Sequence, residues 1–276
     1  MSQPVMRPYY RLSGKWGLTQ LATGQPFYVD VESRDITPWI LMLGRWELFV
    51  DDVLGALAEP GHTFLDVGAN VGYYSVRIGG LVGPEGMVHA FEPNPELYEF
   101  VAENLNINGY HSFRAHNMAV ADKVGELVLS YDRRRPGGGT VMLDGQAPNP
   151  QLPQPVVAVT SLDAALPETT ADLIKIDIEG FEPLAFAGMK ALLARSPNCS
   201  IVTEVSYRQW ERFGHPATLL REIAHGKRLF RIQLDGRLVE VEHDRISEAM
   251  DKEFVSYMLI LPNTPTKFER IRHLLG

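Results

Sequence analysis

The chain has 276 residues, of which 45% are hydrophobic and 22% are charged, so it can bury a full core and suits one large domain with a small extension. Its net charge of -8 at pH 7 disfavours a nucleic-acid backbone as the substrate. With Cys199 as its single cysteine, it can form neither an internal disulfide nor a cysteine-based zinc site.

No run of eighteen apolar residues occurs, and the amino-terminal stretch lacks the apolar core of a signal peptide. We therefore expect a cytoplasmic protein that does not insert into a membrane. Residues 1–50 are interpreted as an N-terminal extension, and residues 51–276 as the main domain. In the extension we expect a short strand or hairpin near 27–31 and then a helix. Its aromatic residues either pack the extension onto the main domain or line a substrate pocket: Tyr9, Tyr10, Trp16, Trp39 and Trp46.

The most informative stretch is FLDVGANVGYYS, residues 64–75. Its apolar residues suit a buried strand, and the residues from Tyr73 onward can begin a helix. Gly68 and Gly72 suit a turn at which the backbone bends sharply or lets a ligand approach closely. The stretch therefore predicts the first strand, turn and helix of a nucleotide-binding α/β sheet.

Two carboxylates indicate which nucleotide binds. Asp66 ends the first strand, and Glu92 ends the next apolar strand, about twenty residues after the turn, where a carboxylate can accept both hydrogen bonds of a ribose diol. An acid directly before the turn would repel the pyrophosphate of NAD. It would attract the ammonium and sulfonium of S-adenosylmethionine. In addition, Asn70 stands where a dinucleotide fingerprint would have its second glycine.

After residue 62, strands and helices alternate. We expect strands over 63–67, 87–91, 125–131, 156–160, 173–178, 200–205, 229–234, 237–241 and 254–261, and a strand with the turn after it over 111–120. We expect helices over 73–81, 97–106, 161–166, from 180 to about 195, and over 207–213, 219–224 and 266–275. Asp235-Gly236 between two alternating runs predicts a hairpin. Residues 132–155 carry too much glycine and proline for regular structure, and we interpret them as a lid over the substrate or as an inert surface loop.

A second informative stretch is LIKIDIEGFE, residues 173–182. Asp177 and Glu179 lie at or beyond the end of a buried strand, which is where open α/β sheets bind ligands. A charge within such an apolar run is costly unless it is used or paired. Glu204 repeats the pattern near the end of the next strand. These three carboxylates are the candidate catalytic residues.

Taken together, the chain resembles the FkbM-type methyltransferases, a branch of the class I S-adenosylmethionine-dependent enzymes. Six runs carry the resemblance: FLDVGANVGYYS, FEPNPELYEFVAENLNIN, NMAVADKVGELVL, TSLDAAL, LIKIDIEGFE and IVTEVS. It covers roughly residues 46–207. It implies an α/β, Rossmann-like sheet of seven strands, with helices on both faces, an antiparallel last strand and a small N-terminal extension.

The resemblance also implies, position by position, which residues bind S-adenosylmethionine. The methionine part would lie against Asp66, Gly68, Asn70 and Gly72, the ribose on Glu92, the adenine near Asn117 and Ala119, and the sulfonium next to Asp177. The implied set is completed by Glu47, Ala69, Tyr73 and Asn94. Residues 1–45, the loop 132–155 and the segment after 207 match poorly, and these are the parts expected to select the acceptor.

The expected function is S-adenosylmethionine-dependent O-methylation of a hydroxyl on a natural product or sugar. N-methylation of a peptide or amide stays open, as does, more distantly, a non-catalytic nucleotide-binding protein; a dehydrogenase is disfavoured by Asp66. Three histidines could also serve as a base: His116, His215 and His225. No histidine spacing indicates a metal site, and although Asp177 with Glu204 could chelate magnesium, we expect no metal. The expected partner is a small-molecule or peptide acceptor, with neither nucleic acid nor membrane bound.

Overall fold

The computed structural model describes residues 7–141 and 149–276. Part of the predicted loop, residues 142–148, lies outside the described residues. Within the described chain, no helix is both long enough and apolar enough to cross a membrane.

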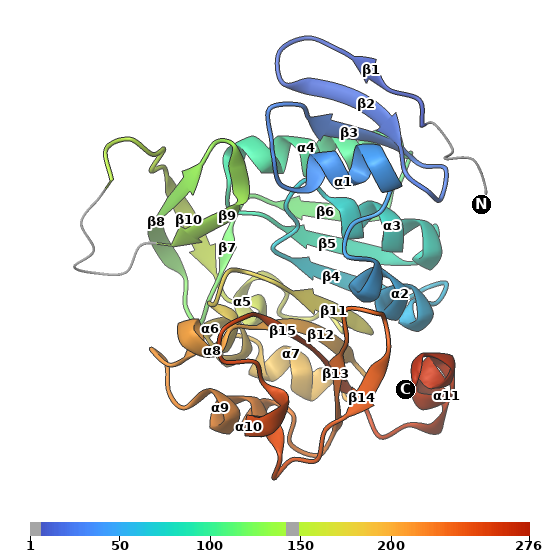
Figure 1. The fold of residues 1–276 in the computed structure, drawn as a ribbon, viewed down its shortest axis with the longest axis vertical. Helices are drawn as coiled ribbons and strands as arrows, with labels where there is room; N and C mark the ends of the chain where they lie inside the picture. The colour runs from blue at the N-terminus through green and yellow to red at the C-terminus, as the bar shows by residue number, and fades with distance from the viewer. Residues whose placement is uncertain (1–6, 142–148) are drawn as a thin grey trace.

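An eight-stranded sheet forms the centre of the molecule (Figure 1). From one edge to the other it contains β14 (Leu238–Glu240), β13 (Arg228–Ile232), β15 (Ser256–Leu261), β12 (Ser200–Val205), β11 (Leu173–Ile176), β4 (Thr63–Val67), β5 (Met87–Phe91) and β6 (Phe113–His116). The five strands from β12 to β6 run parallel to one another, whereas β15 runs antiparallel to both of its neighbours, β12 and β13. The antiparallel last strand is as predicted. The sheet has eight strands instead of seven because β14, the second arm of the predicted hairpin, pairs with β13 at the edge.

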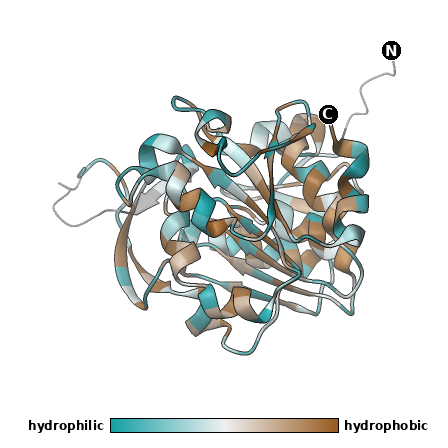
Figure 2. Cartoon of the chain, turned by 90° about the horizontal axis from the view of Figure 1, so that it is seen from below, coloured by the Kyte–Doolittle hydropathy of each residue, from teal (hydrophilic) through white to brown (hydrophobic). Residues whose placement is uncertain are grey.

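Helices cover both faces of this sheet, as predicted. One face packs against α1 (Ile36–Leu43), α2 (Leu48–Leu57), α3 (Tyr73–Val82), α4 (Pro95–Ile107) and α11 (Pro265–Ile271). The other packs against α5 (Leu162–Ala165), α6 (Glu182–Ala187), α7 (Lys190–Arg195), α8 (Tyr207–Trp210), α9 (Pro216–Ile223) and α10 (Ile246–Ala249). A 3-10 turn, η1 (Arg272–Leu274), ends the chain. In Figure 2 the strands are largely brown, between helices that alternate brown and teal.

Side chains along β4 alternate between the hydrophobic cores on the two faces of the sheet. Phe64 joins the core on the α3 side, whereas Leu65 and Val67 join the core on the α6 side. Asp66 therefore points toward the same face as Phe64, where Ser75 of α3 donates a hydrogen bond to its carboxylate at 2.6 Å. Cys199 is fully buried just before β12, and burial raises the pKa of its thiol to about 12, as suits a small buried hydrophobe.

The N-terminal extension forms a small antiparallel sheet of β1 (Tyr10–Arg11), β2 (Trp16–Gln20) and β3 (Pro26–Asp30). Figure 1 shows this sheet beside α4. Trp16 stacks on Phe100 of α4 with ring centroids 4.0 Å apart, and Asn104 bonds the main chain of Tyr28. The prediction of one strand or hairpin and one helix was incomplete. Three strands form, and the helical stretch breaks into α1 and α2 at Gly44, whose φ is +66°.

A second small sheet lies beside the carboxyl ends of the central strands (Figure 1). Its order is β7 (Ala119–Val120), β10 (Val156–Thr160), β8 (Gly125–Asp132) and β9 (Arg135–Val141). The prediction that residues 132–155 lack regular structure was wrong for β9. Strand pairing uses only main-chain groups, so β9 can pair with β8 through Arg135, Thr140 and Val141, while its glycines lie in the irregular stretch between these pairs.

Candidate active site

A cavity of about 340 Å³ opens at the carboxyl ends of the central strands. Strands β4, β5, β11 and β12 each contribute residues at or just past their ends, which is where open α/β sheets bind ligands. Most of the residues predicted from the sequence lie in its wall: Glu47, Gly68, Ala69, Asn70, Tyr73, Glu92, Asn94, Ala119, Asp177, Glu179 and Glu204.

The glycine turn after β4 is held tightly between neighbouring strands. The N–H groups of Gly68 and Ala69 both donate to the carbonyl of Phe91 at 2.9 Å. Gly68 has φ +82°, and a Cβ there would lie 1.9 Å from the carbonyl oxygen of Asp177. Only glycine fits that position, and the close approach brings the turn directly against the end of β11. Asn70 is also left-handed, with φ +54°.

Glu92 anchors both the turn and the next helix. One carboxylate oxygen accepts from the N–H of Asn70 at 2.8 Å, and the other accepts from the N–H of Asn94 at 2.9 Å. Burial raises the pKa of Glu92 to about 7. Each oxygen keeps a further acceptor position, so the carboxylate can still receive two hydroxyl groups from the cavity.

Three predicted residues do not lie in the cavity wall: Asp66, Gly72 and Asn117. Asp66 is completely buried behind it. Gly72 caps α3 with φ +84°, and a Cβ there would lie 3.2 Å from the Cα of Val101. Asn117 donates to the carbonyl of Glu92 at 2.9 Å. These residues lie behind the wall and support the turn and the strand ends that form it, and their contact with a ligand stays a prediction.

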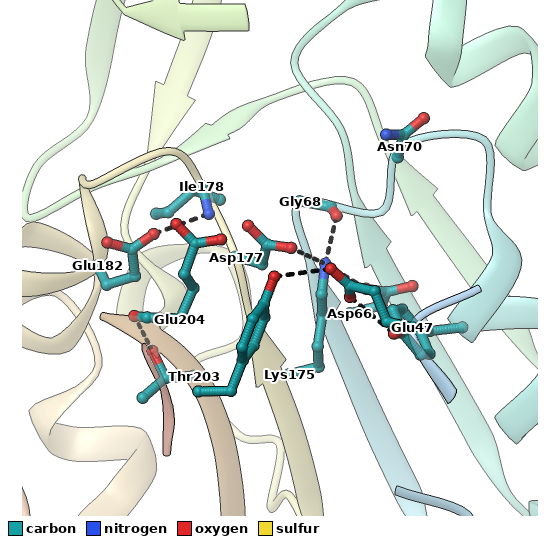
Figure 3. Close-up of polar contacts among 12 residues, drawn as sticks. Glu47, Asp66, Gly68, Asn70, Lys175, Asp177, Ile178, Glu182, Thr203 and Glu204 are labelled. Atoms are coloured by element: carbon teal, nitrogen blue, oxygen red, sulfur yellow. Dashed lines mark hydrogen bonds and ion pairs between the residues drawn. The ribbon is translucent and has the colours of Figure 1, made fainter. Parts of the chain in front are cut away.

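The charge of Asp66 is opposed by a residue that the sequence interpretation did not use. Lys175 of β11 lies opposite Asp66 in the parallel register, with its Nζ 3.6 Å from the Asp66 carboxylate and 3.7 Å from that of Asp177 (Figure 3). Its ammonium also donates to the carbonyl of Gly68 at 2.6 Å. The nearby acids outweigh the effect of burial and raise the pKa of Lys175. The spacing of Lys175 two residues before Asp177 was the available signal, since such residues share a face of a strand.

The candidate catalytic carboxylates converge at one end of the cavity. Glu204 is 8% exposed and faces Asp177 in Figure 3. Burial and the neighbouring charge of Asp177 raise the pKa of Glu204 far above its ordinary range. The pKa of Glu179 is raised to about 7, mainly by burial and then by the charges of Asp177 and Glu182. Glu204 is therefore a neutral acid at pH 7, and Glu179 titrates near neutrality.

A second structural carboxylate fixes the turn that carries Glu179. Glu182 is fully buried and accepts from the N–H groups of Ile178 at 2.9 Å and Gly180 at 3.1 Å, and from the indole of Trp210 at 2.8 Å. These bonds hold Glu179 in the left-handed region at φ +56°, which is uncommon for a residue with a side chain. Strained backbone of this kind gathers at functional sites.

Glu47 connects the chain before β4 to two distant elements. Its carboxylate accepts from the hydroxyl of Tyr74 in α3 at 2.9 Å and from that of Tyr257 in β15 at 2.7 Å. Burial and the charge of Asp177 raise the pKa of Glu47 to about 7. Tyr257 lies opposite Glu204 in the register of β15 with β12 and also lines the cavity. No local sequence pattern indicated a role for Tyr257.

The extension and β9 also contribute to the cavity wall. Asp35, directly before α1, accepts from the N–H of Gly137 at 2.8 Å, and both residues lie in the wall. Trp46 also lines the cavity, whereas Trp16 packs on α4 and Trp39 is 50% exposed. The three candidate histidine bases lie outside the wall: His116, His215 and His225.

The cavity has the chemistry to hold S-adenosylmethionine. Two buried side-chain atoms in its wall, Asn70 Oδ1 and Asn94 Nδ2, have no hydrogen-bond partner among the described residues and are available to a ligand. Glu92 can receive a ribose diol, and several carboxylates face a ligand that carries two positive groups. An apolar wall suitable for an adenine ring is formed by Met118, Ala119, Leu127 and Leu129.

Relatives of the chain are methyltransferases by name. A protein-L-isoaspartate O-methyltransferase of Aeropyrum pernix is 50% identical over 52 residues, which are 19% of this chain and 20% of that protein. Methyltransferase 1 of Beauveria bassiana is 24% identical over 162 residues, which are 52% of this chain and 65% of that protein. The chain thus covers only about a fifth of the first relative. The crystal structure of TYW2 from M. jannaschii in complex with AdoMet aligns with a TM-score of 0.44 at 12% identity, covering 91% of this chain and 86% of that one.

The family is established by a longer match. A model of the methyltransferase FkbM domain matches residues 66–247, which is more than half of the 276 residues. That range contains the glycine turn, Glu92 and the carboxylates of β11 and β12, which together build most of the cavity. The chain belongs to the FkbM family of S-adenosylmethionine-dependent methyltransferases.

Proposed function

We propose that the protein transfers a methyl group from S-adenosylmethionine to a hydroxyl oxygen of a natural product or sugar. The observation that carries this proposal is the convergence of Asp177, Glu179 and Glu204 at one end of a cavity whose other end suits adenosine. An alcohol must lose its proton as the new bond to carbon forms, so a hydroxyl acceptor needs a base beside the transferred carbon.

When bound, S-adenosylmethionine supplies a methyl group already activated by its positive sulfur. We assign the proton transfer to Glu179, because it lies in the cavity wall, its backbone is fixed by Glu182, and its pKa of about 7 lets it accept a proton at neutral pH. As the acceptor oxygen takes the methyl group, the hydroxyl proton would pass to the Glu179 carboxylate.

The other two carboxyl groups take different roles in this proposal. Asp177 lies 3.7 Å from the ammonium of Lys175, and its charge faces the position expected for the sulfonium. Glu204 carries a proton at neutral pH and therefore donates a hydrogen bond, so it orients the acceptor and does not remove its proton. Neighbouring carboxyls whose environments separate their pKa values commonly divide acid and base work in this way.

The N-terminal extension and the main domain take different roles in this proposal. Asp35, Ile36 and Trp46 place the N-terminal extension in the wall of the cavity that also contains the catalytic carboxylates. Residues 1–50 would then cap the acceptor side, while the domain from residue 51 onward binds the cofactor.

Calorimetric titration with S-adenosylmethionine, S-adenosylhomocysteine and NAD tests the cofactor. We expect binding of the two sulfur compounds and none of NAD. Turnover to S-adenosylhomocysteine is then measured with a panel of polyols, phenols and sugars and with a matched panel of unmodified peptides. Turnover that requires a free hydroxyl supports the proposal, whereas turnover only with peptides that lack hydroxyl side chains would assign the enzyme to N-methylation.

A further inference from the structure

The cavity is too small to enclose both the cofactor and a whole acceptor. Its volume of about 340 Å³ lies near the lower end of the range for ligand pockets, about 300 to 1,000 Å³. If the proposed function is right, the cofactor takes most of this space. The residues that suit its adenosine, such as Met118, and those that suit its charged end, such as Asp177, both belong to the wall. Only the reacting end of an acceptor then fits inside, and the rest must lie on the surface next to the cavity.

That surface includes an uncharged stripe along α1. Ile36, at the start of the helix, is 2% exposed and lines the cavity. Trp39 and Leu43 follow at i+3 and i+7, so they continue the same side of the helix, and they are 50% and 41% exposed. Met42 flanks them and is 70% exposed. At 1.5 Å per residue, the stripe extends about 10 Å from the cavity.

Aromatic contact joins the stripe to the cavity wall. The rings of Trp39 and Trp46 meet edge to face with centroids 6.4 Å apart, and Trp46 lines the cavity. No charged residue occurs in the helix sequence ITPWILML. The cavity interior, in contrast, is rich in carboxylates, among them Asp177, Glu179 and Glu204. Polarity therefore changes sharply between the cavity and the adjoining surface.

We propose that the acceptor is amphipathic, with a hydroxyl-bearing end that enters the cavity and an apolar arm that lies along the α1 stripe, defined by Trp39, Met42 and Leu43. This inference rests on the proposed function. Exposed, contiguous apolar side chains commonly mark a binding surface. Here the continuity with the cavity identifies the occupant as part of the same molecule that reacts there.

The test uses methyl, hexyl and octyl β-D-glucosides as probes below their micelle-forming concentrations, titrated into protein saturated with S-adenosylhomocysteine. We expect octyl glucoside to bind at least about tenfold more tightly than methyl glucoside, since each fully buried methylene contributes roughly fourfold in affinity and a surface groove buries only part of each. Trp39→Ser and Met42→Ser should each reduce this ratio of octyl to methyl glucoside affinity by more than half. Leu234→Ser, a matched control at an 80% exposed leucine on the distant β13–β14 hairpin, should leave it unchanged.

Several outcomes would overturn the inference. Equal binding of methyl and octyl glucoside would do so, as would a gain that survives both α1 substitutions. A dimer in sedimentation velocity that Met42→Ser dissociates would instead assign the stripe to a second copy of the chain. Affinity for S-adenosylhomocysteine is measured first: absence of binding by the wild-type protein would count against the proposed function, whereas variants that keep this affinity report on the apolar arm alone.

Discussion

The ammonium of Lys175 donates a hydrogen bond to the carbonyl oxygen of Gly68 at 2.6 Å, and so ties the end of β11 to the turn after β4. The same ammonium lies within 4 Å of the carboxylates of Asp66 and Asp177. One buried cation thus holds the cofactor turn and opposes two acids. Its loss would leave the carboxylate of Asp66 in a region that is completely buried.

We therefore expect Lys175→Met to destabilise the protein by about 3 to 5 kcal/mol, the usual cost of removing one partner from a buried ion pair. Urea unfolding followed by circular dichroism measures this loss. The double variant Lys175→Met with Asp66→Asn should recover part of it, because the unpaired buried charge is gone. If the double variant is no more stable than the single one, then charge compensation is not the role of Lys175.

A matched pair of glycines separates backbone conformation from close packing. Gly61 and Gly68 share a φ of +82°, but a Cβ on Gly61 would meet nothing within 4 Å, whereas on Gly68 it would lie 1.9 Å from the carbonyl oxygen of Asp177. Gly61→Ala should cost about 1 to 2 kcal/mol, the penalty of a left-handed conformation. Gly68→Ala should cost more and should also weaken cofactor binding. Equal losses of stability and affinity in the two variants would rule out the tight packing of the turn.

Glu92 should control cofactor affinity. Glu92→Ala should weaken binding of S-adenosylmethionine by about 1 to 3 kcal/mol, the usual effect of removing hydrogen bonds to a charged group. It should also lower the melting temperature, because the N–H groups of Asn70 and Asn94 lose their acceptor. Glu92→Gln keeps an acceptor oxygen and should fall between wild type and alanine in both measurements. Unchanged affinity in a folded alanine variant would remove the ribose assignment.

Local motifs explain why the cofactor half of the site could be predicted from the sequence. The strand, the glycine turn and the following helix lie within residues 63–82, and the next strand ends at Glu92. Each feature depends on conformational preferences over a few residues, and strand ends in such sheets meet at one edge. The alternation of side chains along a strand, however, could not show which neighbours Asp66 has. In the structure these are Ser75 of α3 and Lys175.

The rest of the cavity wall depends on contacts between distant residues. Asp35 and Gly137 are 102 residues apart, and Glu47 and Tyr257 are 210 apart, yet each pair is joined by a hydrogen bond. No local pattern encodes such a pairing, so the roles of Asp35 and Tyr257 were missed. The strand β9 was missed for a related reason. Its glycines have low strand propensity, and its pairing with β8 is what stabilises it.

Close packing of β9 on the cofactor turn gives a further prediction. A Cβ on Gly137 would lie 2.3 Å from Nδ2 of Asn70, whereas on the neighbouring Gly138 its nearest contact would be the carbonyl oxygen of Arg135 at 3.8 Å. Gly137→Ala must displace the Asn70 amide, and we expect it to weaken S-adenosylmethionine binding by about 1 kcal/mol, the scale of one hydrogen bond. Gly138→Ala should bind normally. Calorimetry that finds both variants equal to wild type would show that β9 does not constrain the turn.

Glu179 should make the activity depend on pH. The pKa of Glu179 is raised from 4.5 to about 7, chiefly by burial. A base works only when it is ionised, so kcat/KM should rise about tenfold per pH unit below 7 and level off above it. Glu179→Gln should lower kcat by about 100-fold or more and abolish this limb of the pH profile. A variant with reduced activity but an unchanged pH profile would show that Glu179 only supports the fold.

Stability should change with pH in the opposite direction to activity. Because the folded protein binds the Glu179 proton more tightly than the unfolded chain does, the contribution of this group to stability is complete below about pH 4.5 and is lost as the pH rises through about 7. Glutamine cannot ionise, so Glu179→Gln should flatten the decline in the free energy of unfolding between these pH values. Glu179 would then be a residue whose ionisation costs stability in the same pH range in which it enables proton removal, as expected for a base held in a strained, half-buried position.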